Sequence, residues 1–264
     1  MKIAPKKSLG QNFLLNNDII KKIVELGKVT SQSNVIEIGP GTGNLTNEIL
    51  KKNPKFFAAI EKDNNLYKEL KSKYKSKIEL INQDVLSIDW KKYKNKNIIV
   101  FGNLPYNIST EILCKWILNI DKNKFWFESL VLMFQKEVAD RIISDFNTKN
   151  YGRLSILANW KLSMKKICDI MPSSFYPKPK ILSSVLLIKP KLNFFPLKNP
   201  KNLEKLTRLF FMHRRKMLKK PYRNLFKGNI EVAEKLKINL NLRPQNLDFM
   251  TYYRLTEEYE KLRG

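Results

Sequence analysis

The chain has 264 residues, and its 43% hydrophobic content is enough for one large α/β domain with a small appendage. Its 50 basic and 24 acidic residues give a formal net charge of +26, which indicates a polyanionic partner, with nucleic acid as the first candidate. A simpler interpretation is a lysine-rich surface produced by biased codon usage. All nine arginines fall at or after Arg141, so guanidinium contacts with phosphate belong to the second half of the chain.

Several classes of protein are excluded by what the chain lacks. Its longest apolar runs, such as LVLMF from Leu130, are too short to span a bilayer. No basic and then apolar leader precedes a cleavage site, so we expect a soluble cytoplasmic protein. Cys114 and Cys168 lack metal-ligand spacing, and the single histidine, His213, has no companion ligands. We therefore expect neither a metal site nor histidine-dependent chemistry.

Hydrophobic periodicity predicts alternating strands and helices in the first part of the chain. The segment DIIKKIVELGKV predicts a helix, with apolar residues at 19, 20, 23, 24 and 26, a cap at Asn16 or Asn17 and a stop at Gly27. The elements expected next are a strand at 34–39, a helix at 43–52, a strand at 56–61, a helix at 63–73, strands at 78–82 and 98–102, a helix at 110–119, a strand at 129–134 and a helix at 135–144. This alternation predicts an α/β fold with a parallel sheet covered on both faces.

The later segments predict an edge of the sheet and then a helical region. RLSILANW and ILSSVLLIKP are expected to be two further strands, antiparallel at an edge. After Pro190 the proline-punctuated FFPLKNPKN leads into helical patterns, with apolar positions at 203, 206, 210 and 211 and again near 232–240. We expect a first domain over residues 1–194 and a small all-helical domain over 195–264.

A glycine-rich turn, VIEIGPGTGNLT, joins the first predicted strand to its helix. Gly39, Gly41 and Gly43 let the backbone approach a ligand closely at the carboxyl end of that strand. The turn is not a Walker loop, since no Gly-Lys-Ser/Thr follows, and its spacing differs from the dinucleotide fingerprint. Glu61 ends the next strand, where such folds place an acid on ribose hydroxyls, and Asp84 ends the third. Either acid also suits the capping of the helix that follows.

The successive motifs EIGPGTG, IEKD, NQDVL and GNLPY resemble those of Rossmann-like S-adenosylmethionine-dependent methyltransferases. The resemblance implies that Gly39 lines the methionine end of the cofactor, Glu61 holds the ribose and Asp84 meets the adenine amino group. The N-terminal QNFL matches the motif that closes over the cofactor, and it implies contacts from Asn12 and Leu14. The other cofactor-binding residues expected at these motifs are Gln11, Gly41, Gly43, Lys62, Val85 and Asn103.

The strand predicted at 98–102 breaks into Asn-Leu-Pro-Tyr, which is not an ordinary polar turn. The lone pair of an adenine N6 amine is delocalised into the ring, and two hydrogen-bond acceptors that face its N–H bonds draw the pair back onto nitrogen. Asn103 offers a side-chain oxygen, and Leu104, held extended by Pro105, offers its carbonyl oxygen. Tyr106 then supplies a face on which the base stacks.

Both catalytic assignments have a purely structural alternative. Asn-Leu-Pro-Tyr also suits a proline turn in which Ser109 or Thr110 caps the following helix, with Glu111 in its first turn. Phe175, beside the rigid Pro-Lys-Pro of PSSFYPKPKILSS, is expected to close the other face of a flipped adenine opposite Tyr106. The alternative for Phe175 is a core residue before a proline turn.

Taken together, SLGQNFL, GNLPYNIST, MFQKEVADRI, YGRLSIL, FYPKPKILSS and a helix with RRKMLKK resemble the ribosomal RNA adenine dimethyltransferase family over nearly the whole chain. The resemblance implies the transfer of two methyl groups from S-adenosylmethionine to N6 of each of two adjacent adenosines. The target is a hairpin near the 3′ end of small-subunit (16S) ribosomal RNA, with a role in small-subunit biogenesis. Residues 1–194 would then bind the cofactor and carry catalysis, and residues 195–264 would dock RNA. Separately from the resemblance, we expect a monomer.

The RNA-binding residues expected in the arginine-bearing half are Arg153, Arg208, Arg214, Arg215, Lys216, Lys219 and Arg223. The chain departs from the family pattern at Glu111, where relatives often carry Pro, and at Ile181, where Val is usual. The segment FFMHRRKMLKKPYRNLF also differs around its shared Arg-Arg-Lys core.

Three other functions share part of this pattern. A large-subunit adenine methyltransferase of the macrolide-resistance type has the same cofactor motifs and tetrad, but QKEVADRI and YGRLS favour the small-subunit branch. A checkpoint factor for immature small subunits would use the same basic half, whereas Asn103, Tyr106 and Glu61 favour catalysis. A DNA adenine methyltransferase fits least, since the chain has no separate domain large enough to read a DNA sequence.

Overall fold

The structure is a computed structural model, and it describes residues 4–93, 96–120 and 125–263. The chain forms two compact units. The first comprises Met1–Ala139 and Ser163–Pro190, and the second comprises Asp140–Leu162 and Lys191–Gly264. The second unit thus takes in residues 140–162, which the expected division after residue 194 assigned to the first domain, because the helix in this segment packs against C-terminal helices. The roles expected of the two domains stay predictions.

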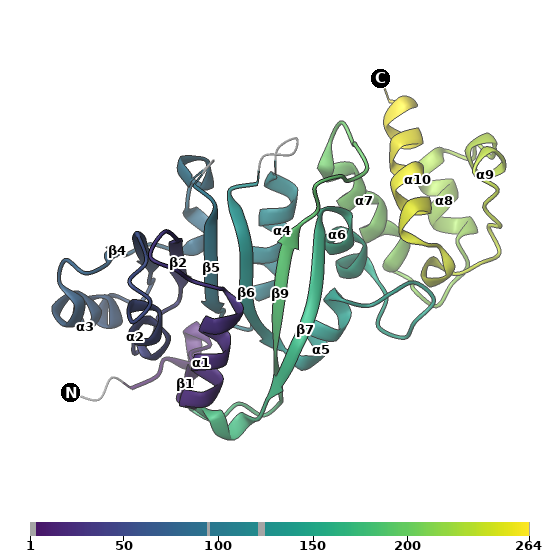
Figure 1. Cartoon of the computed structure of the whole chain (residues 1–264). Helices are drawn as coiled ribbons and strands as arrows, with labels where there is room; N and C mark the ends of the chain where they lie inside the picture. The colour runs from purple at the N-terminus through teal and green to yellow at the C-terminus, as the bar shows by residue number, and fades with distance from the viewer. Residues whose placement is uncertain (1–3, 94–95, 121–124, 264) are drawn as a thin grey trace. The chain divides into compact units, whose positions relative to one another are not determined.

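A seven-stranded sheet with the order β4-β3-β2-β5-β6-β9-β7 forms the centre of the first unit (Figure 1). Its strands are β2 (Asn34–Ile38), β3 (Phe56–Ile60), β4 (Glu79–Ile81), β5 (Ile98–Asn103), β6 (Phe127–Gln135), β7 (Leu162–Ile170) and β9 (Ser183–Pro190). The pairs from β4 to β6 are parallel, and β9 runs antiparallel to β6. A separate antiparallel pair joins β1 (Phe13–Leu14) to β8 (Phe175–Tyr176).

The strand order reverses between β2 and β5, and this reversal positions the functional site. From β2 the chain moves outward to β3 and β4, and it then returns to the other side of β2 as β5. In open α/β sheets, ligands bind in the crevice outside the carboxyl ends of the strands at such a point. The carboxyl ends of β2, β3 and β5 are therefore the place to look for a site.

Helices cover both faces of the sheet. The helices that begin in the first unit are α1 (Asn17–Leu26), α2 (Asn44–Leu50), α3 (Asn64–Tyr74), α4 (Ser109–Asn119) and α5 (Lys136–Ile142). Because βαβ crossovers are right-handed, α2 and α3 lie on one face, and α4, which connects strands in the opposite direction, lies on the other. On the α2 face, Val35 of β2 and Ile99 of β5 share a core with Ile23 of α1. The predicted fold class is confirmed.

The second unit is helical. Its helices are α6 (Arg153–Lys161), α7 (Pro200–Phe211), α8 (Lys219–Phe226), α9 (Glu231–Lys235) and α10 (Phe249–Lys261) (Figure 1). The short 3₁₀ turns in the described part of the chain are η1 (Lys7–Leu9), η2 (Val85–Ser87), η3 (Trp90–Tyr93), η4 (Pro172–Ser174) and η5 (Pro244–Asn246). Among the described residues, no helix is long and apolar enough to cross a membrane.

Several expected elements are correct, and four differ from the structure in type, position or length. The alternation over residues 34–144 is confirmed within two residues at each boundary, and Asn16 caps α1 by accepting from the amides of Asp18 and Ile19. RLSILANW, however, is helix α6 and not a strand, and the edge strand is β7, which was not predicted. ILSSVLLIKP contains β9, which lies between β6 and β7 and not at the edge. RRKMLKK is mostly a turn that leads into α8, and the 232–240 pattern ends as a helix at Lys235.

Candidate active site

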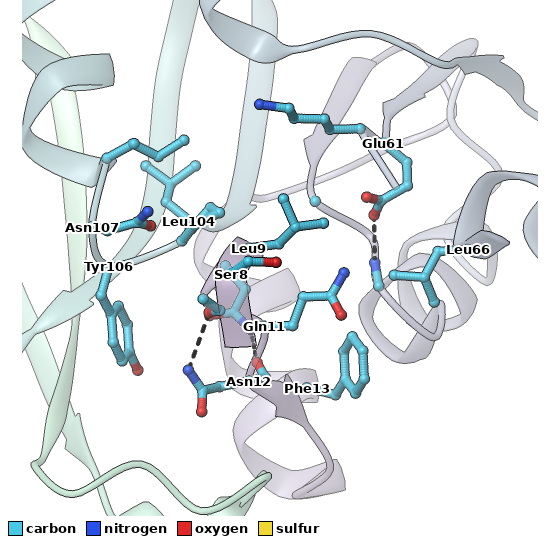
Figure 2. Close-up of a pocket in the computed structure, with 17 residues that line it drawn as sticks. Ser8, Leu9, Gln11, Asn12, Phe13, Glu61, Leu66, Leu104, Tyr106 and Asn107 are labelled. Carbon is cyan, nitrogen blue, oxygen red and sulfur yellow. Dashed lines mark hydrogen bonds between the residues drawn. The ribbon is translucent and has the colours of Figure 1, made fainter. Parts of the chain in front are cut away.

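A pocket of about 150 Å³ lies at the carboxyl ends of β2, β3 and β5 (Figure 2). Ten of the expected site residues line it, namely Gln11, Asn12, Gly39, Gly41, Glu61, Lys62, Asn103, Leu104, Pro105 and Tyr106. Seven lining residues were not expected, namely Ser8, Leu9, Gly10, Phe13, Leu66, Asn107 and Ile108. Most of these seven are sequence neighbours of QNFL and Asn-Leu-Pro-Tyr, so their position beside a motif was the signal that the sequence offered.

The glycine turn follows β2 and lines the pocket with Gly39 and Gly41. Gly39 and Gly41 have φ of +66° and +57°, which favours glycine. The Gly39 amide donates to the carbonyl oxygen of Ile60 at 2.9 Å, so the turn is tied to the end of β3. A Cβ added at Gly41 would lie 2.8 Å from the Phe13 ring. The turn therefore leaves no room for a side chain beneath the N-terminal segment.

Glu61 supplies the acid of the pocket. Its side chain is buried, with Oε1 accepting from the Asp63 amide at 2.8 Å and Oε2 from the Gly41 amide at 3.3 Å. Burial raises its pKa, and the backbone hydrogen bonds act against that rise. Figure 2 shows this carboxylate beside the glycine turn, where its remaining lone pairs can accept hydrogen bonds from ribose hydroxyls.

Asp84 lies outside the pocket and takes part in two local interactions. Its Oδ2 forms an ion pair with Lys62 Nζ at 2.7 Å. Its Oδ1 accepts a hydrogen bond from the Leu86 amide at 2.9 Å, and this bond caps η2. Burial alone would raise the pKa of Asp84, but the Lys62 ammonium and the cap hold it below its usual value. Lys62 lines the pocket, so this ion pair lies at its margin.

Asn103 ends β5 with its side-chain amide held in one orientation. Its Nδ2 donates to the carbonyl oxygen of Asn12 at 2.6 Å. Because the nitrogen is engaged by a carbonyl, Oδ1 is the atom of the amide left to accept a hydrogen bond. Leu104 follows with a buried side chain, and Pro105 comes next.

Tyr106 is held in place by a hydrogen bond between its hydroxyl and Ser183 Oγ at the start of β9. Burial raises the pKa of Tyr106. The expected capping role of Ser109 or Thr110 is wrong, because α4 begins at Ser109, its N-cap is Ile108, and no side chain caps it. Ser109 Oγ instead donates to the carbonyl oxygen of Tyr106 at 3.2 Å, which ties the tetrad to the first turn of α4.

Glu37 is a buried acid that the sequence reasoning missed. It lies in β2, two residues before Gly39, and borders a smaller cavity of about 30 Å³ that Gly39, Gly41 and Asn103 also line. Thr46 Oγ1 donates to Glu37 Oε2 at 2.6 Å. Burial raises the pKa of Glu37 to about 8, so the carboxyl is mostly protonated near neutral pH. The sequence signal that could have identified Glu37 is its position as the first residue of the glycine-rich motif EIGPGTG.

Five expected site residues do not line the main pocket. They are Leu14, Gly43, Asp84, Val85 and Phe175. Leu14 lines the smaller cavity. Gly43 is the N-cap of α2, and its carbonyl oxygen accepts from the Tyr74 hydroxyl at 2.9 Å. Phe175 is 4% exposed and belongs to a cluster of buried core residues. In this conformation it fits the alternative interpretation of a core residue before a proline turn.

The seven expected RNA-binding residues all lie in the second unit. Two are engaged within it, since Arg153 Nη2 lies 2.6 Å from Glu204 Oε1 and Arg214 Nη2 donates to the carbonyl oxygen of Thr148 at 3.0 Å. The other five are exposed, namely Arg208, Arg215, Lys216, Lys219 and Arg223. Within the described ranges, no group of three or more His, Cys, Asp or Glu residues has the arrangement of a metal site.

Comparison with known proteins decides the family. Residues 4–261 match the family model described as ribosomal RNA adenine dimethylase. The chain belongs to this family. A "Ribosomal RNA small subunit methyltransferase A" of Pelagibacter ubique (strain HTCC1062) is 60% identical over 264 residues, which cover 100% of both proteins. The predicted family, its methyltransferase activity and its cofactor, S-adenosylmethionine, are confirmed.

Two solved structures have the same fold. A dimethyladenosine transferase from Plasmodium falciparum is 28% identical, with a TM-score of 0.79 over 94% of this chain and 98% of that one. The 23S rRNA methyltransferase ErmE is 21% identical, with a TM-score of 0.66 over 94% of this chain and 99% of that one. At that identity the second likeness shows the fold alone.

Proposed function

We propose that this protein dimethylates N6 of two adjacent adenosines in a hairpin near the 3′ end of small-subunit ribosomal RNA. Membership of the ribosomal RNA adenine dimethylase family supports ribosomal RNA as the substrate, and the relative named for the small subunit supports the choice of subunit. The observation in the site that carries the chemistry is Asn103, whose Nδ2 is held by the Asn12 carbonyl so that Oδ1 is left as an acceptor.

S-adenosylmethionine supplies an electrophilic methyl group on a sulfonium. The residues of the chain hold that group and prepare the nucleophile. Glu61 accepts from ribose hydroxyls, and the glycine turn at Gly39 and Gly41 lets the backbone approach the methionine end. Asn103 Oδ1 and the Leu104 carbonyl oxygen accept the two amine hydrogens of the target adenine, which localises the lone pair on N6.

Tyr106 gives the target base a face to stack on, and its hydroxyl bond to Ser183 fixes the angle of the ring. After one methyl transfer the amine keeps a single N–H. One of the two acceptors, Asn103 Oδ1 or the Leu104 carbonyl oxygen, must therefore release its hydrogen bond before the second methyl transfer. Neither step needs a strong base in the pocket, because the amine loses its proton only after it has gained the methyl group and become acidic.

RNA binding is assigned to the exposed cations of the second unit, and the formal charge of +26 favours a polyanion. We extend the proposal to a monomer that works in the cytoplasm without a metal ion.

The experiment that tests this function supplies labelled cofactor with unmodified small subunits and, separately, with large subunits. Digestion of the RNA and identification of the labelled nucleoside then give substrate and product together. We expect N6,N6-dimethyladenosine from the small subunit alone. Label in the large subunit would support the macrolide-resistance type instead, and binding to small subunits without label would support a checkpoint factor.

A further inference from the structure

The N-terminal segment 4–12, called the strap below, crosses the cofactor pocket. Residues 8–12 contribute to the wall of the pocket. Figure 2 shows Ser8, Leu9, Gln11 and Asn12 between Glu61 on one side and Tyr106 on the other. The strap continues into Phe13 of β1, which packs over Gly41. Its position raises the question of what holds it against the pocket.

One buried carboxylate, Asp63, holds the strap at two points. The Asp63 side chain is 0% exposed, and its Oδ1 lies 2.9 Å from Lys6 Nζ. Its Oδ2 accepts from Gln11 Nε2 at 3.0 Å. Hydrogen bonds from Lys6, Gln11 and the Asn65 amide outweigh the effect of burial and keep the Asp63 pKa below its usual value, so the group is ionised at neutral pH.

The strap is also braced along its own length. Gln11 Oε1 accepts from the Lys6 amide at 2.7 Å, so both residues that reach Asp63 also hold each other. Asn12 Nδ2 donates to the Gly10 carbonyl oxygen at 3.2 Å. At its far end, the Asn12 carbonyl oxygen accepts from Asn103 Nδ2. A displacement of the strap at Asp63 is therefore passed along a short, hydrogen-bonded segment to Asn103.

Asp63 is joined to the ribose-binding acid as well. Its amide donates to Glu61 Oε1, and Glu61 is two residues earlier in the chain. The same turn thus carries the acid that would hold the cofactor and the anchor that holds the strap.

We infer that Asp63 is a positioning residue that couples cofactor binding at Glu61 to the orientation of Asn103, through Lys6, Gln11 and the Asn12 carbonyl. Asp63 touches neither substrate nor cofactor in this role. The catalytic half of the inference rests on the proposed role of Asn103 and the cofactor half on the proposed role of Glu61, and neither depends on which RNA is the substrate.

The test uses Asp63→Asn, Lys6→Met and the double variant in the full chain. Asparagine keeps the volume and the acceptor that caps α3 through the Asn65 amide, but it removes the charge opposite Lys6 and sets an NH₂ group against one of the two strap donors. Lys6→Met leaves the cap intact and serves if the first variant folds poorly. The control is Asp89→Asn, which changes an exposed aspartate that accepts from the Lys91 amide at 3.0 Å.

Two quantities are measured, namely the Kd of S-adenosylhomocysteine by calorimetry and the single-turnover rate of methyl transfer at saturating cofactor. Because each single variant removes a charged hydrogen bond that holds the strap, we expect a roughly tenfold or larger rise in Kd for each. We also expect a slower single turnover. The effects of Lys6→Met and Asp63→Asn should not add in the double variant, because both break the same contact. Trypsin should cut after Lys7, a site that every variant keeps, faster in each variant, and the control should match the wild type.

The inference is overturned if Asp63→Asn and Lys6→Met keep the wild-type Kd and single-turnover rate. It is also overturned if their only effect is a lower Tm without ligand, which would mean that Asp63 has a merely structural role. A wild-type protein that transfers no methyl group would instead refute the proposed function. The Kd and the proteolysis of the strap would still decide whether Asp63 is linked to the cofactor site.

Discussion

At the scale of single residues, the proposed chemistry depends on which atom of the Asn103 amide faces the substrate. The bond from Nδ2 to the Asn12 carbonyl decides this, since reversing the amide would set two oxygens against each other at 2.6 Å. A neutral amide acceptor suits an amine whose lone pair must be localised without being protonated. The buried acids nearby, Glu37 and Glu61, have other hydrogen-bond partners within the fold.

The replacement Asn103→Ala removes this acceptor. We expect methyl transfer to fall by at least about 100-fold, the usual cost of losing one preorganised hydrogen-bonding group. Cofactor affinity should change much less, since Glu61 and the glycine turn remain. The matched control is Asn34→Ala, because Asn34 Nδ2 also donates to a backbone carbonyl, that of Lys96, at 2.6 Å, but at the opposite end of the sheet. Equal rates for the two variants would remove Asn103 from the mechanism.

Glu37 makes stability depend on pH in a definite direction. Its pKa is about 8 in the folded protein against 4.5 for the free side chain, so the folded state binds the proton more tightly. The resulting stabilisation is complete below about pH 4.5, declines as the pH rises towards 8, and is absent above. Glu37→Gln cannot titrate. We expect its unfolding free energy relative to wild type to rise between pH 5 and pH 9, by up to about 1.4 kcal/mol per pH unit. Urea titrations at several pH values measure this, and parallel pH profiles would contradict it.

The local motifs of the site could be predicted from the sequence, but the contacts between distant segments could not. Gly39 and Glu61 follow hydrophobic strands and Asn103 ends one, and parallel strands bring their carboxyl ends together. The link between Gln11 and Asp63 joins residues 52 apart, and no periodicity encodes it. Phe175 is the reverse case, since its aromatic type suited the site while its side chain lies in the core, and its expected role stays a prediction.

At the scale of elements, the first half of the sheet could be predicted because its strands are bounded by turns and its helices are amphipathic. Helix α6 gave no such signal. It is buried nearly all round, including Ile156, Leu157, Ala158 and Trp160, so RLSILANW shows a short apolar run without a polar face. Periodicity cannot tell such a helix from a buried strand. The edge strand β7 was missed for the opposite reason. Most of its LSMKKICDI is partly or fully exposed, and Lys165 and Lys166 interrupt the alternation of apolar and polar residues.

The glycine turn after β2 leads to a prediction at this scale. In Gly41→Ala a new Cβ would lie 2.8 Å from the Phe13 ring at a φ of +57°, so Phe13 and β1 must shift. We expect cofactor affinity to fall about tenfold or more because the strap, residues 4–12, leads directly into β1. Gly228→Ala is the control, since Gly228 has a φ of +85° and nothing within 4 Å of the added atom. Both variants should lose about 1 kcal/mol of stability through backbone strain. If calorimetry gives both the same cofactor Kd, close packing at Gly41 is unimportant.

At the scale of the whole molecule, RNA binding has two contributions, namely attraction by the net charge and contacts of particular cations with phosphates. A formal charge of +26 attracts RNA to any part of the protein, whereas docking requires particular cations to lie against phosphates. Arg215 and Lys216 are the sharpest candidates, because both are exposed in the turn between α7 and α8, while Arg153 and Arg214 have partners within the second unit. Binding at several salt concentrations distinguishes the two effects, since each phosphate contact releases counterions.

We therefore compare two double variants. One combines Arg215→Gln with Lys216→Gln, and the control combines Lys21→Gln with Lys22→Gln on the exposed side of α1. Both double variants lower the formal charge by two, from +26 to +24. If Arg215 and Lys216 each neutralise a phosphate, the slope of log K against log salt should fall by about 0.7–0.9 for each contact, and affinity at low salt should drop. The control should keep the wild-type slope. Filter binding of small-subunit RNA measures both. Equal slopes in the two double variants would mean that RNA responds to the total charge and that the contacts lie elsewhere.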